Sequence, residues 1–414
     1  MNDRKPESYR FLAGDCTVLN DPFITGLNNH DLVVGSSSAG KTECYVIPNL
    51  LLADYSMVVV DTKGLLYRRY RDYLKKRGMN VMKIDFVNPD KSCTYNMLDY
   101  VRKDRSGKGY RQKDLKSIAA MMLPDNFDKE KIWVDSSRLM LISLMAYVME
   151  QIVDSERNMK TVARIYQKIA PDLMDDKTDG IRLFEELRLE NPDSFAVSMY
   201  DMFRANAAAD KMMASISMFV GAALEPFVYD DMNDLLAGSN PIKFRDIGRK
   251  KTVLFVNISD TDRSMDGIIG VFYQQMFQNL VDEADTHDDG RLDIPVRIIL
   301  DDFASNFVIP DFDKLLTTIR SRCIYASVVI QSVSQLETMY EKPRAKTIFN
   351  NCDCKIFIGS QDRDTADFIA DMAGCLPETV MTLKSDQEYV VIRGEKPKIA
   401  SRIKPRSMDA QFGV

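Results

Sequence analysis

The sequence predicts an α/β protein with a mainly parallel sheet and an inserted all-helical domain. Short apolar runs rich in β-branched residues occur in the first quarter of the chain and again in its second half, at 32–34, 57–60, 81–84, 252–257, 296–300, 326–330, 354–358 and 389–392. Segments of helical period separate most of these runs, which is typical of parallel strands joined by crossover helices.

The middle of the chain predicts the helical domain, because a helical repeat continues there with almost no strand pattern. We expect helices at 113–123, 132–153, 158–168, 179–189, 194–204 and 208–224. The chain therefore divides into the first part of the core at 1–101, the inserted domain at 102–243 and the second part of the core at 244–414.

The composition indicates a large globular protein. The chain has 414 residues, of which 45% are hydrophobic and 28% charged, and its formal net charge is −6. Nucleic acid would therefore have to bind at a local basic patch. Seven cysteines suit a reducing compartment without disulfides or a structural metal. We expect the two histidines, His30 and His287, at the surface, so catalysis must rest on carboxylates, lysine and arginine.

The hydrophobic pattern of the sequence predicts neither a secretory signal nor a membrane-spanning helix. The N-terminus is polar and lacks the apolar stretch of a secretory signal. The longest near-continuous apolar run, 139–149, is shorter than the ~20 residues that a membrane-spanning helix needs. We therefore expect the chain in the cytoplasm.

The most specific motif is a phosphate-binding loop that follows the apolar run at 32–34. Its pattern is Gly-x-x-x-x-Gly-Lys-Thr, in which the glycines let N–H groups turn toward phosphates, the lysine reaches the β- and γ-phosphates and the threonine hydroxyl binds Mg²⁺. The expected ligand is a nucleoside triphosphate. The strand before the loop disfavours the alternative, a serine-rich surface turn. The predicted nucleotide-binding residues are Gly35, Ser36, Ser37, Ser38, Ala39, Gly40, Lys41, Thr42 and Glu43.

A second candidate site is the pair Asp301-Asp302, which directly follows the apolar run at 296–300. We assign Asp301, with Thr42, to the magnesium ion of the nucleotide and Asp302 to the attacking water. Without the phosphate loop, a strand that runs into an acidic turn would be an equally good interpretation. The helical insertion accounts for the long separation of the two motifs.

Two further candidates lie around the run at 326–330. Gln331 follows this run, so its amide is placed to hydrogen-bond either the γ-phosphate or a neighbouring loop and to sense hydrolysis. Arg320 or Arg322, before the run, would serve as an arginine finger toward an adjacent subunit. The competing interpretation of both arginines is a solvated face or a local ion pair.

These residues resemble a known family, the type IV secretion coupling proteins, which are ring-forming ATPases of conjugative DNA transfer. The resemblance covers nearly all of the chain, and the motifs occur in the family's order. Besides the phosphate loop it includes Pro48-Asn49-Leu50, 61–64, 95–99, Trp133, Asp301 to Ala304, 319–322, 331–336, 351–353, Gly359, Asp362 and Thr365-Ala366.

The resemblance implies a RecA-like ATPase core that uses ATP and Mg²⁺, and an all-helical domain that recognises cargo. It further implies a homo-hexameric ring that handles relaxase-bound single-stranded DNA, with accessory proteins and secretion channel components as partners. Members usually carry N-terminal membrane helices. This chain shows none, so we expect it at the inner face of the bacterial cell membrane, held there by a partner protein if at all.

The chain departs from the family pattern at three places. Members usually have Asp-Glu in place of Asp301-Asp302, Asp-Pro-Lys-Gly-Glu in place of 61–65 and Asn-Pro-Leu-Asp in place of 96–99. The shorter side chain of Asp302 withdraws its carboxylate by roughly an ångström, a displacement that can cost on the order of a hundredfold in rate. The hydrolysis rate is therefore open, whereas nucleotide binding does not need this carboxylate.

Three function hypotheses follow. The first is a motor or gate that couples a DNA-transfer complex to a secretion channel. The alternatives are a nucleotide-binding adaptor that docks protein cargo with little hydrolysis, and a DNA-packaging or partition pump on the same core. Basic runs at 68–77, 102–113 and 393–406 are candidate contacts to DNA phosphates, although such runs are more often solvated faces.

Overall fold

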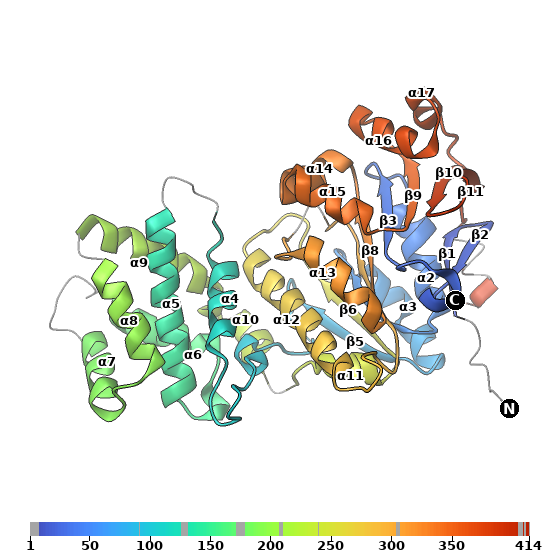
Figure 1. Ribbon diagram of the computed structural model, residues 1–414. Helices are drawn as coiled ribbons and strands as arrows, with labels where there is room; N and C mark the ends of the chain where they lie inside the picture. Colours follow the sequence, from blue (N-terminus) through green and yellow to red (C-terminus); the bar gives the residue numbers. More distant parts are fainter. Residues whose placement is uncertain are drawn as a thin grey trace. The chain divides into compact units, whose positions relative to one another are not determined.

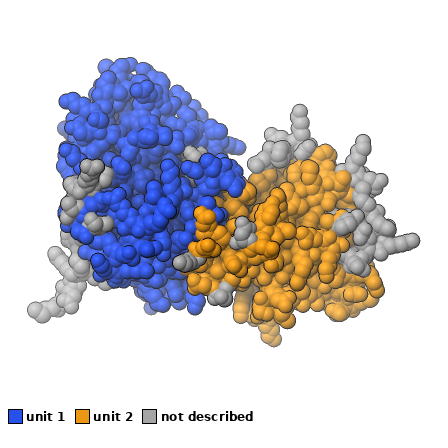
Figure 2. Space-filling model, turned by 180° about the vertical axis from the view of Figure 1, so that it is seen from behind, with its two compact units in different colours: residues 1–87, 243–263, 276–414 blue, residues 88–242, 264–275 orange. Residues whose placement is uncertain are grey.

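The computed structural model describes residues 8–90, 92–125, 131–170, 179–206, 210–238, 240–303, 307–404, 409 and 411–413. The chain forms two compact units, each built from separate stretches of sequence. Unit 1 comprises 1–87, 243–263 and 276–414, and unit 2 comprises 88–242 and 264–275 (Figure 2).

Across the described residues, unit 1 contains a nine-stranded sheet of order β11-β10-β9-β3-β8-β7-β4-β6-β5. The strands from β9 to β5 in this order are parallel, and β10 and β11 are antiparallel at one edge. The predicted α/β class with a mainly parallel sheet is confirmed. The strands are β3 (Asp31–Gly35), β4 (Ser56–Val60), β5 (Asn80–Asp85), β6 (Thr252–Asn257), β7 (Val296–Leu300), β8 (Ile324–Ile330), β9 (Cys354–Gly359), β10 (Gln387–Ile392) and β11 (Lys398–Ser401).

Helices cover both faces of this sheet. Figure 1 shows α13 in front of the sheet and α3 behind it, and they contact β8 and β5 respectively. An unpredicted hairpin of β1 (Tyr9–Ala13) and β2 (Cys16–Leu19) packs on the α3 side. The helices are α1 (Pro22–Thr25), η1 (Thr42–Val46), α2 (Ile47–Leu52), α3 (Leu65–Lys76), α11 (Phe244–Arg249), α13 (Phe312–Ile319), η8 (Arg320–Arg322), α14 (Val333–Tyr340), α15 (Lys342–Asn350), α16 (Arg363–Ala373) and α17 (Pro377–Met381).

The central strands of unit 1 are buried on both faces, which is why they read as continuous apolar runs in the sequence. Neighbouring β3, β8 and β7 run parallel, so their carboxyl ends meet at one edge of the sheet. This edge receives the phosphate loop after β3, Asp301 after β7 and Gln331 after β8.

A fully buried ionic cluster lies toward the amino ends of β3 and β7. The Asp31 carboxylate accepts hydrogen bonds from Arg10 Nε at 2.9 Å, from Arg297 Nη1 at 2.9 Å and from the Tyr45 hydroxyl at 2.6 Å. Tyr45 also lies 2.7 Å from Ser327 Oγ, and Ser327 pairs with Asp31 across β8 and β3. Burial alone would raise the pKa of Asp31, but the two guanidinium groups outweigh it and hold the pKa below its usual value.

His30 lies in the interior, so the expectation of a surface residue was wrong for this histidine. Its Nδ1 accepts the Ala326 backbone N–H at 2.9 Å, so Nε2 carries the proton and donates to the Leu316 carbonyl at 3.0 Å. Burial lowers the pKa of His30 to about 4, and the ring is neutral. Both ring nitrogens are used within the fold, which makes His30 a structural residue.

Unit 2 is mainly helical, and its helices begin and end within two residues of the predicted bounds wherever a helix was expected. Residues 208 and 209 of the predicted last helix lie outside the described residues, and α10 was not expected. The elements are η2 (Met97–Tyr100), α4 (Gln112–Met122), α5 (Lys131–Gln151), η4 (Asp154–Glu156), α6 (Met159–Ile169), α7 (Asp179–Glu190), α8 (Phe195–Asn206), α9 (Asp210–Leu224), η6 (Glu225–Phe227) and α10 (Asp230–Ala237).

The bounds of unit 2 differ from the 102–243 expected for the inserted domain. The unit also takes in 88–101 and the first part of α12 (Asp266–Ala284). Tyr95 explains why: its hydroxyl donates to Gln275 Oε1 at 2.6 Å, and its ring packs edge-on against Phe272 with centroids 5.1 Å apart. These contacts join segments that are far apart in the sequence.

The central helix of unit 2 is α5, which packs against α4, α6, α8 and α9. At 21 residues and a mean hydropathy of 1.3, it is the one helix in the described parts of the chain that is long and apolar enough to cross a membrane. A buried core helix can have the same length and hydropathy. In α5, 61% of the apolar window is buried inside the structure.

Candidate nucleotide-binding site

The phosphate loop leaves β3 at Gly35 and enters the helical segment that begins with η1. Gly40 has φ +90° and Ser38 has φ +63°, so the loop turns through left-handed conformations. A Cβ on Gly35 would lie 3.2 Å from the Ile358 Cβ and 3.3 Å from the Ala39 Cβ, which is tighter than ordinary van der Waals contact. The first glycine of the motif is therefore required by close packing and the second by its backbone conformation.

Lys41 lies at the centre of the site and is buried. Its Nζ donates to the carbonyl oxygens of Gly35 at 2.9 Å and Ser36 at 3.2 Å, and it lies 3.6 Å from Asp302 Oδ1. The ammonium group is thus held inside the concave side of its own loop, where it can meet an anionic ligand.

Thr42 and Asp301 are in direct contact, although 259 positions separate them. Thr42 Oγ1 donates to Asp301 Oδ2 at 2.6 Å. Asp301 is only 9% exposed, and burial, together with the adjacent charge of Asp302, raises the pKa of its carboxyl to about 6. A cation beside this carboxylate would offset the unfavourable burial of its charge.

The donor set fits Mg²⁺ on chemical grounds. Mg²⁺ prefers oxygen ligands and is commonly held by one or two protein groups together with substrate phosphates and water. The Thr42 hydroxyl and the Asp301 carboxylate supply two such oxygens beside the loop. The described residues contain no group of three or more His, Cys, Asp or Glu side chains that could hold a metal.

Asp302 adopts φ +50°, a left-handed conformation that aspartate tolerates better than longer side chains because its short carboxylate bonds locally. This offers a physical reason for aspartate where the resemblance expects glutamate. Gln331 Nε2 lies 3.4 Å from Asp302 Oδ1, so the two side chains approach each other. Asp302 is 39% exposed and faces solvent as well as Lys41.

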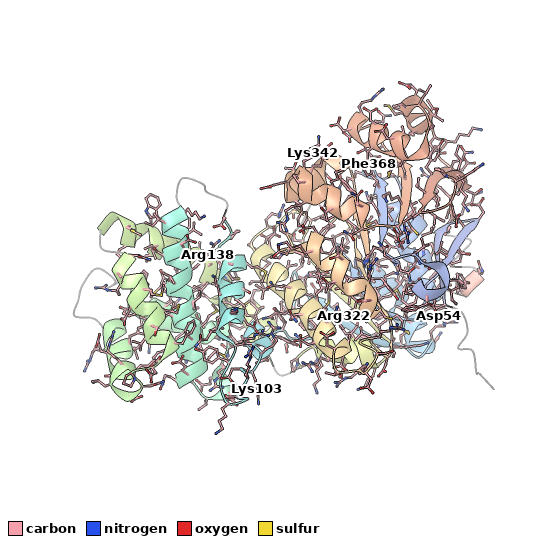
Figure 3. All side chains as sticks on the ribbon, in the orientation of Figure 1. Asp54, Lys103, Arg138, Arg322, Lys342 and Phe368 are labelled. Atoms are coloured by element: carbon pink, nitrogen blue, oxygen red, sulfur yellow. The ribbon has the colours of Figure 1, made fainter. Side chains whose placement is uncertain are left out.

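Arg320 is the one predicted catalytic residue that this chain does not bring to its own site. It is exposed and precedes the amino end of β8, whereas Gln331 follows the carboxyl end. Arg322, labelled in Figure 3, donates to Asp285 Oδ1 at 2.8 Å, which matches the alternative of a local ion pair. The structure therefore joins residues 35–43 with Asp301, Asp302 and Gln331.

Three residues near the loop have roles that the sequence did not predict. Arg402, which follows β11, donates to the Ala39 carbonyl at 3.0 Å. Glu388 lies buried on β10, the strand between β11 and β9. Gly359, noted only as a motif position, accepts the Ser36 N–H at 2.9 Å. No spacing signal could have found Arg402, because 363 positions separate it from Ala39.

Other motif residues have structural roles or lie outside the described residues. The buried Asp61 carboxylate accepts the Tyr67 backbone N–H at 2.9 Å and so caps the start of α3. Ala304, from the matched segment that begins at Asp301, lies outside the described residues. The last two residues of the basic run 393–406, Pro405 and Arg406, also lie outside them. Ion pairs within the chain engage at least one arginine of each basic run, among them Arg69 with Asp409, Arg102 with Asp114 and Arg393 with Asp353.

The raised pKa of Asp301 makes the free energy of unfolding depend on pH. Between about pH 4 and about pH 6 the native carboxyl keeps a proton that the unfolded chain has released, so the free energy of unfolding falls as pH rises through this window. Asp301→Asn removes this penalty of about 3 kcal/mol but loses one hydrogen bond worth ~1 kcal/mol. We expect the variant, without nucleotide, to be about 2 kcal/mol more stable than the parent above the window in urea unfolding.

Below about pH 4 this advantage should disappear, because Asp301 is then neutral in both the native and the unfolded chain. If the free energies of unfolding of Asp301→Asn and the parent differ by the same amount below and above this window, the raised pKa of Asp301 is contradicted. The substitution Asp54→Asn, which removes a partly exposed carboxylate elsewhere in unit 1, serves as the control.

The parallel sheet with a phosphate loop after β3 and an aspartate pair after β7 is the fold and motif arrangement of P-loop nucleotide-binding proteins. The model of the family described as type IV secretory system conjugative DNA transfer matches residues 2–376. The chain belongs to this family, which confirms the resemblance seen in the sequence.

Curated relatives agree with this membership. The VirD4 proteins of Rhizobium rhizogenes and of Agrobacterium fabrum are each 22% identical over 407 residues, covering 90% of this chain and 58% of the relative. The chain thus spans 58% of the length of these relatives.

Solved structures show the same fold. The bacterial conjugative coupling protein TrwBdeltaN70, unbound, superposes with a TM-score of 0.66 at 15% identity, covering 91% of this chain and 85% of that one. TrwB in complex with ADP and Mg²⁺ gives 0.66 at 16% identity, covering 91% and 86%. VirB4 of Thermoanaerobacter pseudethanolicus gives 0.56 at 13% identity, covering 98% and 99%. The RecA-like fold implied by the resemblance is confirmed.

Proposed function

We propose that this chain is an ATP-dependent coupling protein of a conjugative type IV secretion system. It would recruit relaxase-bound single-stranded DNA and drive or gate its transfer. The single observation that carries the proposal is the contact of Thr42 with Asp301, which joins the phosphate loop to the aspartate pair in one site. Family membership supports the conjugative role, and TrwB, a protein of the same fold, has been solved with ADP and Mg²⁺.

In this proposal each site residue has a separate task. Residues 35–43 hold the phosphates of ATP, and Lys41 binds the β- and γ-phosphates. Thr42 and Asp301 hold Mg²⁺, which when bound neutralises charge on the transferred phosphoryl group. Asp302 orients the attacking water, and Gln331 senses hydrolysis through its approach to Asp302.

Arg320 would act in a neighbouring subunit of a homo-hexamer. Its side chain is exposed and lies at the opposite edge of the sheet from its own phosphate loop. A guanidinium in this position can serve a site only on another copy of the chain. An arginine supplied in this way stabilises charge on the phosphoryl group in the transition state.

The partners follow from the same proposal. Unit 2 would recognise relaxase or accessory proteins, and unit 1 would handle the DNA strand and meet the secretion channel. The chain would work in the cytoplasm at the inner face of the bacterial membrane, held there by a partner protein.

A second candidate is an adaptor that binds nucleotide and docks cargo with little hydrolysis. The short side chain of Asp302 favours it, because this carboxylate reaches less far than glutamate would. A DNA-packaging or partition pump on the same core is a third candidate, to be distinguished by its cargo.

Lys41→Ala is the direct test of the motor function. The substitution removes a charge-assisted contact to the phosphates, so we expect ATP hydrolysis, with and without single-stranded DNA, to fall by at least about tenfold. Hydrolysis is measured against protein concentration, and the specific activity of the parent should rise as rings assemble. Equal basal and DNA-stimulated rates for the two proteins would refute the motor.

The control for assembly is Arg320→Ala. It should bind nucleotide like the parent but lose the increase of specific activity with concentration. A parent that binds ATP and does not hydrolyse it under any of these conditions would identify the chain as an adaptor.

A further inference from the structure

The carboxyl end of β11 delivers a guanidinium group to the outside of the phosphate loop. Arg402 follows β11 and uses all three of its guanidinium nitrogens on backbone carbonyls. Nη1 donates to Ala39 at 3.0 Å, Nε donates to Gln387 at 2.8 Å, and Nη2 donates to Ile358. One side chain therefore joins the loop, the end of β9 and the start of β10.

The loop is held at two points by this side of unit 1. The Ser36 N–H donates to the Gly359 carbonyl at 2.9 Å, and the Ala39 carbonyl is held by Arg402. Gly359 has φ +121°, and a Cβ there would lie 3.5 Å from Arg402 Nη2. The backbone conformation therefore requires glycine at this position, whereas a Cβ would make only an ordinary van der Waals contact with the guanidinium.

Holding the Ala39 carbonyl also fixes the next N–H. The peptide bond is planar and trans, so the carbonyl oxygen of one residue and the N–H of the next point in opposite directions. With its Ala39 oxygen turned toward Arg402, this peptide must point the Gly40 N–H away from Arg402. Phosphate loops bind anions through N–H groups oriented in this way.

Arg402 brings a positive charge that no carboxylate cancels. Among the described residues, no Asp or Glu oxygen forms an ion pair with it. The nearby Glu388 is 1% exposed, and neither of its carboxylate oxygens has a hydrogen-bond partner in the described structure. Burial raises the pKa of Glu388 to about 8, against the effect of Arg402, so the group is mainly neutral at neutral pH.

We propose that Arg402 is a positioning residue for phosphate binding, which fixes the peptide between Ala39 and Gly40 and adds uncompensated positive charge behind the loop. The hairpin of β10 and β11 thereby becomes part of the nucleotide site. The inference rests on the proposed nucleotide binding, and it adds a residue that the motif itself does not contain.

The test uses the full chain and a fluorescent ADP analogue with Mg²⁺, titrated well below the unfolding midpoint of each variant. Arg402→Gln should raise the Kd about tenfold, since a charged hydrogen-bonding group is lost. Arg402→Lys keeps the charge but cannot reach three carbonyls, so its Kd should lie between those of the parent and Arg402→Gln. The affinity of Arg402→Gln should also depend less on salt than that of the parent.

Arg363→Gln is the matched control, because Arg363 is an exposed arginine of the same unit that pairs with Asp367 and Glu378. Its Kd should equal that of the parent. A purely structural Arg402 would lower the unfolding midpoint and leave the Kd of the folded protein unchanged, and that result would overturn the inference. If Arg402→Gln fails to fold, a parental Kd for Arg402→Lys at every salt concentration overturns it as well. A parent that binds no nucleotide at all would instead refute the proposed function.

Discussion

Asp302→Asn should lower kcat for ATP hydrolysis by about 10²–10⁴-fold and leave nucleotide affinity nearly unchanged. Asparagine has the same size and also tolerates the left-handed backbone found at φ +50°, so the loop should keep its conformation. The amide cannot take up a proton or orient water as a carboxylate does. Single-turnover hydrolysis at saturating Mg²⁺ and ATP measures the chemical step, and a fluorescent nucleotide measures affinity.

Asp311→Asn offers a control with the same backbone geometry. Asp311 has φ +51° and is exposed, and its carboxylate pairs with Lys314 at 2.9 Å and with Arg344 at 3.5 Å. Its substitution should change neither rate nor affinity. If Asp302→Asn hydrolyses ATP as fast as the parent, Asp302 does not act on the water, and the role must belong to another residue.

The features that could be predicted from the sequence are those that local pattern determines. Strands buried on both faces must be apolar throughout, so β3, β4, β6, β7 and β8 were visible as runs. The phosphate loop has a fixed spacing because its backbone geometry is fixed. Asp301 was found because a parallel sheet brings the carboxyl ends of neighbouring strands to one edge, where it meets Thr42.

The remaining features depend on contacts between distant segments, which no local pattern records. Arg402 was assigned to a basic run, yet its guanidinium is used on carbonyls of the phosphate loop and its neighbours. His30 looked like a surface residue because its two buried hydrogen-bond partners come from α13 and β8. Tyr95 extends unit 2 beyond the predicted boundary through contacts to α12.

The buried cluster around Asp31 also depends on contacts between distant segments, so the sequence did not predict it. The charges of this cluster are unbalanced. Arg10, Asp31 and Arg297 are each 0% exposed, so two guanidinium groups share a single carboxylate in the interior. Arg10 contacts Asp31 with Nε at 2.9 Å and Nη2 at 3.0 Å, and Arg297 Nη1 adds a contact at 2.9 Å. The free energy of unfolding of unit 1 should therefore depend strongly on this one carboxylate.

Asp31→Asn should reduce the free energy of unfolding of unit 1 by about 3–5 kcal/mol, because it leaves two buried cations without their counter-charge. The amide is nearly the same size, so the loss cannot come from a cavity. Tyr45 donates to Asp31 from η1, three residues after Thr42, so nucleotide binding should be lost at lower urea concentration than in the parent.

The two units can be followed separately in this experiment. The single tryptophan of the chain, Trp133, lies in α5 of unit 2, so its fluorescence reports that unit, whereas binding of a fluorescent nucleotide reports unit 1. The control is Asp54→Asn, labelled in Figure 3, whose partner Arg77 lies 3.5 Å away at the surface. An exposed pair contributes about 0–1 kcal/mol, so this variant should unfold almost like the parent. Equal losses for the two substitutions would mean that Arg10 and Arg297 find other compensation, and the Asp31 cluster would then not hold unit 1 together.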